Sequence, residues 1–154
     1  MKKFFTYLAP VAIIVLAAGF LVWSQPSAKT VLSIHTSERT YNLLVNVVKT
    51  PGEREQGLMG RPALPEDEGM LFIYETASAP AFWMKNMNFP LDFVFIGSDK
   101  SVVEMMGKVL PCQAADELCP RYKPNHPSRY VLELTGGFVE KYNIQPGDTV
   151  SWEE

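Results

Sequence analysis

Catalytic and metal-binding signatures are scarce in this chain of 154 residues. Its two histidines, His35 and His126, lie far apart in the sequence, and neither belongs to a catalytic motif. A serine-nucleophile elbow, a glycine-rich phosphate loop and the paired-histidine helix of zinc proteases are all missing. These absences argue against the common hydrolase and nucleotide-binding classes and predict no cofactor. They leave open whether the protein is an enzyme, and they favour the interpretation that it is not.

Acidic residues are missing from the first thirty positions, where the only charged side chains are Lys2, Lys3 and Lys29. Taking these three from the chain's 14 basic residues leaves 11 in the remaining 124 positions, against 17 acidic residues, a net charge of −6. Binding to a phosphate backbone depends on clustered lysine and arginine. Nucleic acid is therefore not an expected partner of this acidic part of the chain.

Charge of either sign is absent from residues 4–23, a run of twenty residues that follows Lys2 and Lys3. As a helix this run would be about 30 Å long, the thickness of the hydrocarbon layer of a bilayer. Lysines on the short leading flank favour an N-terminus inside the cell and a C-terminal part outside it. We therefore expect a transmembrane anchor in residues 1–23, a linker in 24–30 and one domain in 31–154, on the periplasmic or extracellular face.

Two other interpretations of this segment remain open. A cleaved signal peptide would have a shorter apolar run and a small-x-small cleavage site, which Pro26-Ser27-Ala28 matches poorly. The domain would then be secreted. A buried core helix is the third interpretation, but the run has no polar stripe to orient it. Trp23 lies where an interfacial aromatic anchor is expected, which favours an uncleaved membrane helix.

Cysteine is limited to two residues, Cys112 and Cys119, with Pro111 and Pro120 on their outer sides. Paired cysteines outside the cytoplasm usually form a disulfide, and this is the favoured interpretation. A metal site would add His126, with Asp116 or His35 as a further ligand, although zinc ligands are more often two to four residues apart. Unpaired thiols are the remaining alternative.

The domain contains many short segments of alternating or β-branched residues bounded by turn residues, and few helical signals. A helix is expected to begin at Pro51, because Thr50 can cap it and Glu53 completes a capping box, and to end by Gly60 and Pro62. One or two further helical turns are expected in 137–142. This pattern predicts a mainly β sandwich or barrel of about seven to nine strands. The predicted strands are 31–36, 41–48, 69–74, 81–85, 92–96, 102–106, 130–134 and 149–152.

Several motifs in the domain resemble the domain-of-unknown-function 192 family. They are Gly57-Leu58-Met59-Gly60-Arg61, Gly69-Met70-Leu71-Phe72, Phe82-Trp83-Met84-Lys85-Asn86, Pro90-Leu91-Asp92, Pro111-Cys112, Tyr130-Val131-Leu132-Glu133 and Gly147-Asp148. The similarity covers residues 40–152 and departs at Met87, where the family usually has a small hydroxyl residue. The resemblance implies a jelly-roll-like domain. It implies no catalytic residues, because the family has no established activity.

The polar residues of these motifs suggest a binding pocket. In an extended segment Trp83 and Lys85 would share one face, with Phe82, Met84 and Asn86 on the other. Trp83 would provide a flat platform, and the cations would bind an anionic group such as a sugar acid or a cell-wall fragment. In the competing interpretation Arg61 or Lys85 pairs with Asp92 and Trp83 is a core residue. The candidate ligand-binding residues are Arg54, Arg61, Trp83, Lys85, Asn86 and Asp92.

Two further groups of residues have a functional and a structural interpretation. Thioethers bind Cu(I), so Met84 and Met87 could form a copper site, but methionine is also a common core residue. The domain's methionines all lie in apolar stretches: Met59, Met70, Met84, Met87, Met105 and Met106. Glu104 and Glu133 could form a carboxylate pair for glycoside cleavage, although salt-bridged or surface glutamates explain them more simply.

Together these features predict a membrane-anchored, extracytoplasmic β domain that acts as a binding or envelope-interaction module. One alternative is a small cell-envelope enzyme, hydrolase-like, that uses side chains near Trp83, Lys85 and Asp92. Another is a metal-handling protein built on the methionines or on the two cysteines. The expected partners are the membrane and an anionic ligand such as a glycan or cell-wall fragment.

Overall fold

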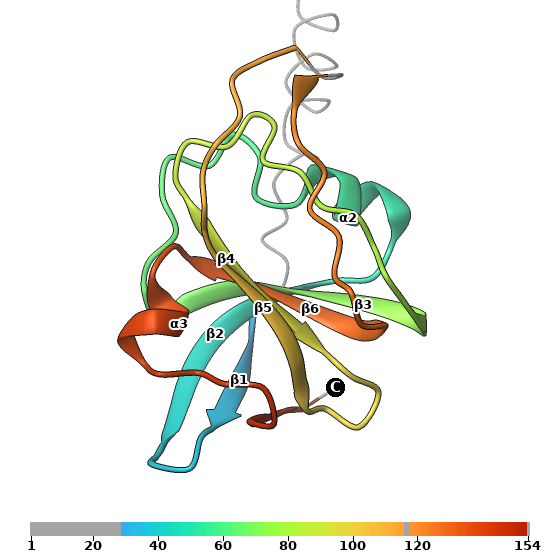
Figure 1. Cartoon of the computed structure of the whole chain (residues 1–154). Coiled ribbons are helices and arrows are strands. Elements are labelled where there is room, and N and C mark those ends of the chain that lie inside the picture. Colours follow the sequence, from blue (N-terminus) through green and yellow to red (C-terminus); the bar gives the residue numbers. More distant parts are fainter. Residues whose placement is uncertain (1–28, 116–117, 154) are drawn as a thin grey trace, which may run out of the picture.

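The structure is a computed structural model that describes residues 29–115 and 118–153. These residues contain seven strands and two short helices. The strands form one sheet in the order β5-β4-β6-β3-β2-β1-β7, so the fold is mainly β (Figure 1). The strands are β1 (Lys29–His35), β2 (Thr40–Val48), β3 (Glu68–Ser78), β4 (Leu91–Ile96), β5 (Val102–Val109), β6 (Ser128–Thr135) and β7 (Thr149–Trp152). The helices are α2 (Pro51–Gln56) and α3 (Phe138–Lys141).

The sheet is mixed and strongly curled, a half-barrel of seven strands where a jelly-roll-like sandwich or barrel of about seven to nine strands was expected. Strands β2 and β3 are parallel, while the other neighbouring pairs are antiparallel. The crossover through α2 causes this, because it returns the chain to the end of the sheet from which β2 started. The edge strands meet at one corner, where Ser101 pairs with Thr149. The described residues therefore form a half-closed barrel from a single sheet.

Helix α2 begins as its capping signals predict. Thr50 Oγ1 accepts a hydrogen bond from the Glu53 N–H (3.3 Å), and Glu53 Oε2 accepts one from the Thr50 N–H (2.9 Å). The helix ends at Gln56, earlier than Gly60, because Gly57 already has a positive φ of 46°. The short helix lets the following residues turn back over the sheet.

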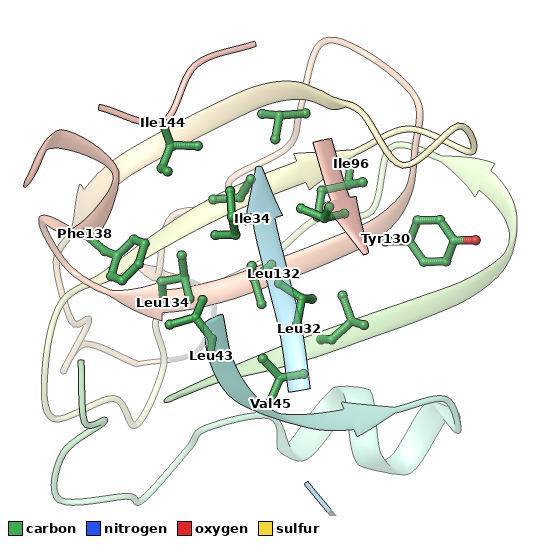
Figure 2. Packing of buried hydrophobic residues seen from close by; sticks show 14 residues of the cluster. Leu32, Ile34, Leu43, Val45, Ile96, Tyr130, Leu132, Leu134, Phe138 and Ile144 are labelled. Atoms are coloured by element: carbon green, nitrogen blue, oxygen red, sulfur yellow. The ribbon is translucent and has the colours of Figure 1, made fainter. Parts of the chain in front are cut away.

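The inner side of the curl holds the first of two apolar clusters. Figure 2 shows its side chains meeting between strands that face each other, with Phe138 of α3 at one end and Tyr130 at the other. This inner cluster consists of Leu32, Ile34, Leu43, Val45, Leu71, Val94, Ile96, Val102, Tyr130, Leu132, Leu134, Phe138, Ile144 and Val150.

The outer side of the sheet carries the second cluster, which is covered by loops rather than by a second sheet (Figure 1). We call residues 57–64, 79–90, 110–115 and 118–124 the cover. Phe82 of the cover packs against Phe72 and Phe93, with ring centroids 5.3 Å apart in both cases. The buried members of this outer cluster are Val48, Leu58, Leu64, Met70, Phe72, Phe82, Met84, Met87, Leu91, Phe93, Phe95, Val109 and Val131.

The predicted strand 81–85 is wrong, although the other predicted strands are present. The segment is extended, but it lies in the cover and makes only isolated bridges, Phe82 with Tyr122 and Lys85 with Cys112. The predicted alternation holds over residues 82–85, because Phe82 and Met84 are buried while Trp83 and Lys85 are half-buried. It ends at Asn86, which is exposed and has a φ of 55°. An extended segment packed on a sheet needs the same side-chain alternation as a strand within it.

The predicted membrane anchor, residues 1–23, lies outside the described residues. Among the residues that are described, no helix is long and apolar enough to cross a bilayer.

Candidate functional site

Trp83 is the centre of a cationic surface site on the cover. Its half-buried ring has the guanidinium carbon of Arg121 at 4.0 Å from the ring centroid and Lys85 Nζ at 5.0 Å. Arg121 is exposed, so its charge is accessible to solvent. A ring with adjacent cations can stack a flat or cyclic ligand and bind an attached anionic group.

Backbone hydrogen bonds on both sides of Trp83 hold this site together. Phe82 and Tyr122 exchange two N–H···O bonds of 2.8 Å, and the Cys112 N–H donates to the Met84 carbonyl oxygen at 2.8 Å. Because Phe82 and Tyr122 pair in an antiparallel bridge, Arg121, which precedes Tyr122, lies opposite Trp83, which follows Phe82. The segment that carries Trp83 is therefore fixed at both ends by the loop that carries Arg121.

The predicted disulfide between Cys112 and Cys119 is confirmed and closes this loop. The bond uses both thiolates on which the cysteine-based metal site depends. His126 contacts Glu104 instead, and His35 bonds to Thr40 and Ser151. In residues 29–115 and 118–153 no group of three or more His, Cys, Asp or Glu side chains is placed to hold a metal ion.

Removing the disulfide is expected to lower the free energy of unfolding by roughly 2.5 kcal/mol, the chain-entropy value for a ring of eight residues. Guanidinium denaturation of the Cys112→Ser, Cys119→Ser double variant, compared with the oxidised chain, measures this loss. Thiol titration of the denatured, unreduced chain should find no free thiol. Two titratable thiols would contradict the bridge.

Asp92 lies away from the other candidate ligand-binding residues. Its side chain is fully buried on the inner side of the sheet, in register with Leu134. Oδ1 accepts hydrogen bonds from the N–H groups of Lys108 (2.7 Å) and Gly137 (2.9 Å), and Oδ2 accepts one from Val139 (2.8 Å). The expected ion pair of Asp92 with Arg61 or Lys85 is therefore wrong, because backbone donors satisfy the carboxylate.

Arg54 and Asn86 also have structural contacts. Arg54 Nη1 donates to the carbonyl oxygens of Lys49 and of Ile73 (3.0 Å for the latter), and its guanidinium lies 4.9 Å from the Tyr74 ring centroid. These contacts join α2 to β3. Asn86 is exposed, has a φ of 55°, and accepts the Gly60 N–H on its carbonyl oxygen at 3.1 Å.

A second polar feature consists of Glu133, which lies beneath the cover, and Arg61, which belongs to the cover. Glu133 is 6% exposed and projects into the outer cluster between Met70 and Phe93. Burial raises the pKa of Glu133 to about 8, and the nearby charge of half-buried Arg61 opposes that shift only in part. A buried carboxyl with a shifted pKa is a recognised marker of a functional site.

The proposed carboxylate pair is not formed. Glu104 lies on the outer side of the sheet two strands from Glu133, with Phe93 and Phe95 of β4 between them. It binds the N–H groups of Asn125 and His126 and both of their side chains. Burial acts to raise the pKa of Glu104, but these hydrogen bonds outweigh it and lower the pKa. Glu104 therefore fixes a turn.

Two residues of these sites were missed by the sequence reasoning. Arg121 gave no signal, because it belongs to none of the motifs and reaches Trp83 only through tertiary pairing. Glu133 was considered only as a partner of Glu104. A signal existed, since Glu133 is a charged residue on the apolar strand Tyr130–Leu134, whose neighbours on both sides are buried.

Solved structures of two other proteins are similar to this fold. One is a candidate transcription regulator from Sinorhizobium meliloti 1021, which is 34% identical with a TM-score of 0.76 over 84% of this chain and 97% of that one. The other is a protein of unknown function from Novosphingobium aromaticivorans DSM 12444, 27% identical, with a TM-score of 0.75 over 83% of this chain and 90% of that one. A comparison with curated proteins gives no match. The sequence pattern of DUF192, described as "Uncharacterized ACR", matches residues 32–152, and the chain therefore belongs to the DUF192 family.

Proposed function

We propose that this chain is a membrane-tethered, extracytoplasmic binding module that takes a small anionic ligand, such as a sugar acid or a cell-wall fragment, at Trp83. The observation that carries the proposal is the contact of Arg121 and Lys85 with the half-buried Trp83 ring. Aromatic rings stack on the C–H faces of sugars, and a guanidinium can bind a carboxylate in a bidentate manner. The ligand therefore combines a ring with a carboxylate.

The apolar N-terminal run and the disulfide both support an extracytoplasmic location. Residues 4–23 are long enough to span a bilayer, and the Cys112–Cys119 bond is typical of an oxidising compartment. A module of this kind would meet its ligand in the cell envelope.

The alternative functions are less well supported. An enzyme centred on Trp83, Lys85 and Asp92 loses its carboxylate, since Asp92 lies on the other side of the sheet. A copper site on Met84 and Met87 would need side chains that are packed in the outer cluster. The regulator description of the similar Sinorhizobium meliloti protein is not extended to DNA binding by this chain, because its domain carries a net charge of −6.

Calorimetric titration of the full-length chain in detergent micelles with digalacturonate tests the proposal. We expect binding, and we expect Arg121→Met to weaken it about tenfold, the effect of one charge-assisted contact. The melting temperature of Arg121→Met should stay within about 2 °C of the parent, because Arg121 is exposed.

Two controls make the result specific. The dimethyl ester of digalacturonate keeps the rings but lacks the charge, and it should bind more weakly. Lys100→Met removes a matched cation, 4.1 Å from the Trp152 ring centroid at the far edge of the sheet, and should leave binding unchanged. If Arg121→Met destabilises the chain and neither sugar binds, the cation–ring contact is structural and the proposal fails.

A further inference from the structure

The first half of β2 has an edge that the sheet leaves uncovered. Strand β3 joins β2 only from Leu44 onward, where Leu44 pairs with Glu68. The earlier residues of β2, 40–43, pair with β1 on one side and with no described strand on the other. A strand edge without a neighbour presents unpaired backbone N–H and C=O groups, which are a template for a further strand.

The register shows which backbone groups face this open edge. In an antiparallel pair, alternate residues of a strand direct their N–H and C=O groups to the same side. The Leu44 N–H donates to the Asp67 carbonyl oxygen at 2.9 Å, on the side where β3 follows. Asn42 and Thr40 alternate with Leu44 in an unbroken register with β1, so their N–H groups face this side too. No backbone group of the described residues pairs with them there.

A groove runs along this edge. It has a volume of about 390 Å³ and is lined by residues 40–43, by residues 66–67 and by Phe138 and Tyr142 of the α3 region. The Tyr142 ring centroid lies 4.3 Å from that of Phe138 and 4.7 Å from that of Tyr41. The Tyr142 hydroxyl donates to Glu66 Oε1 at 2.7 Å. These contacts hold the aromatic and acidic walls in place, so the groove is formed before a ligand binds.

The charges of the groove favour a cationic occupant. Asp67 lines the groove and is exposed, and its carboxylate makes no hydrogen bond or ion pair with another described residue. Glu66 adds a second carboxylate, which already pairs with Lys141. The aromatic rings beside these acids attract cations as well. A lysine or arginine side chain that enters the groove would therefore meet an available carboxylate.

We propose that this groove binds an extended basic peptide segment by strand addition alongside residues 40–43 of β2. The peptide backbone exchanges hydrogen bonds with Thr40 and Asn42, a basic side chain pairs with Asp67, and alternate side chains pack on the rings. Four residues of a strand are about 13 Å long, so a segment of four or five residues matches the open edge. A small organic cation would leave the backbone groups of this edge unused. The groove shares no residue with the Trp83 site and does not depend on the proposed function.

Calorimetric titration of the full-length chain in detergent micelles with acetyl-Lys-Val-Lys-Val-Lys-amide tests the proposal. We expect saturable binding. Two N-methylated forms of the peptide sharpen the test, one methylated on the first, third and fifth residues and the other on the second and fourth. Only alternate N–H groups of an added strand face β2, so one form should lose at least tenfold in affinity while the other binds like the unmethylated peptide.

Variants of the chain test the same contacts from the other side. Asn42→Pro removes an N–H that faces the groove and should weaken binding about tenfold. Asp67→Asn should weaken binding about threefold, the effect of one exposed ion pair. Glu75→Gln is its matched control, because Glu75 is an exposed carboxyl at the other end of β3, and it should leave the affinity unchanged.

Equal affinities of the two N-methylated peptides would overturn the proposal, because the bound peptide would then not be an added strand. Failure of the unmethylated peptide to bind overturns it as well. Sedimentation velocity tests a different occupant, a second copy of the chain. If the full-length chain is a dimer that Asn42→Pro dissociates, this edge pairs with itself and the peptide proposal fails. If Asn42→Pro does not fold, the pair of N-methylated peptides decides alone.

Discussion

Replacement of Asp92 by alanine is expected to lower the free energy of unfolding by about 4 kcal/mol, the largest effect of a single substitution that we predict. The variant leaves three N–H groups that now make part-buried hydrogen bonds, those of Lys108, Gly137 and Val139, without an acceptor. These groups join β5 to the start of α3, so the loss would loosen the end of the curl where Phe138 packs. A fall in melting temperature of more than about 10 °C follows for a domain of this size.

Thermal unfolding followed by circular dichroism measures this effect. Asp99→Ala is the matched control, because Asp99 is exposed and caps only the turn at Ser101. It should change the melting temperature by a few degrees at most. The melting temperature of Asp92→Asn should lie between those of Asp92→Ala and Asp99→Ala, since its amide nitrogen would face one of the N–H donors. Equal melting temperatures for Asp92→Ala and Asp99→Ala would show that the Asp92 contacts are not stabilising.

The second large effect is a loss of folding stability as the pH rises from about 4.5 to about 8. It is caused by the raised pKa of Glu133. In the folded chain the pKa of Glu133 is about 8, against 4.5 as the ordinary value. The folded state therefore holds a proton that the unfolded state has lost, and folding is favoured at the lower pH. The expected loss is a few kcal/mol, because a tenfold change in proton affinity is worth about 1.4 kcal/mol.

Urea denaturation at pH 5, 7 and 9 separates Glu133 from the other titrating groups. Glu133→Gln should match the parent near pH 5 and become more stable than the parent above pH 8. Glu104→Gln should change stability in the opposite direction, since the pKa of Glu104 is lowered in the folded chain. The ionised Glu104 therefore stabilises the parent above its ordinary pKa, and the variant should be the less stable chain there. Parallel pH profiles for the parent and Glu133→Gln would refute a buried, protonated Glu133.

Local patterns predicted much of the secondary structure correctly. The capping residues Thr50 and Glu53 placed the start of α2, the β-branched and apolar residues of 41–48 placed β2, and the turn at 146–148 placed β7. Alternation also assigned Trp83 and Lys85 to one face. It failed to distinguish a strand in the sheet from an extended segment on top of it, because both bury every second side chain.

Pairing between distant segments was outside the reach of local patterns. Nothing near Asp92 indicates that its partners are the N–H groups of residues 108, 137 and 139. Arg121 reaches Trp83 because Tyr122 pairs with Phe82, forty residues earlier. The parallel pairing of β2 with β3 likewise depends on how the crossover packs.

The amino-acid sequence by itself indicated the family and the mainly β class, favoured the disulfide and placed most element boundaries, because these depend on spacings of a few residues or on motifs read directly. Only the tertiary structure decided which charges are buried and which are satisfied by hydrogen bonds. Burial and hydrogen bonding are properties of contacts between distant segments. Asp92 and Glu133 illustrate this, since both are charged residues on otherwise apolar strands and both are buried. Asp92 accepts three backbone hydrogen bonds, whereas Glu133 lies beneath the cover near the charge of Arg61.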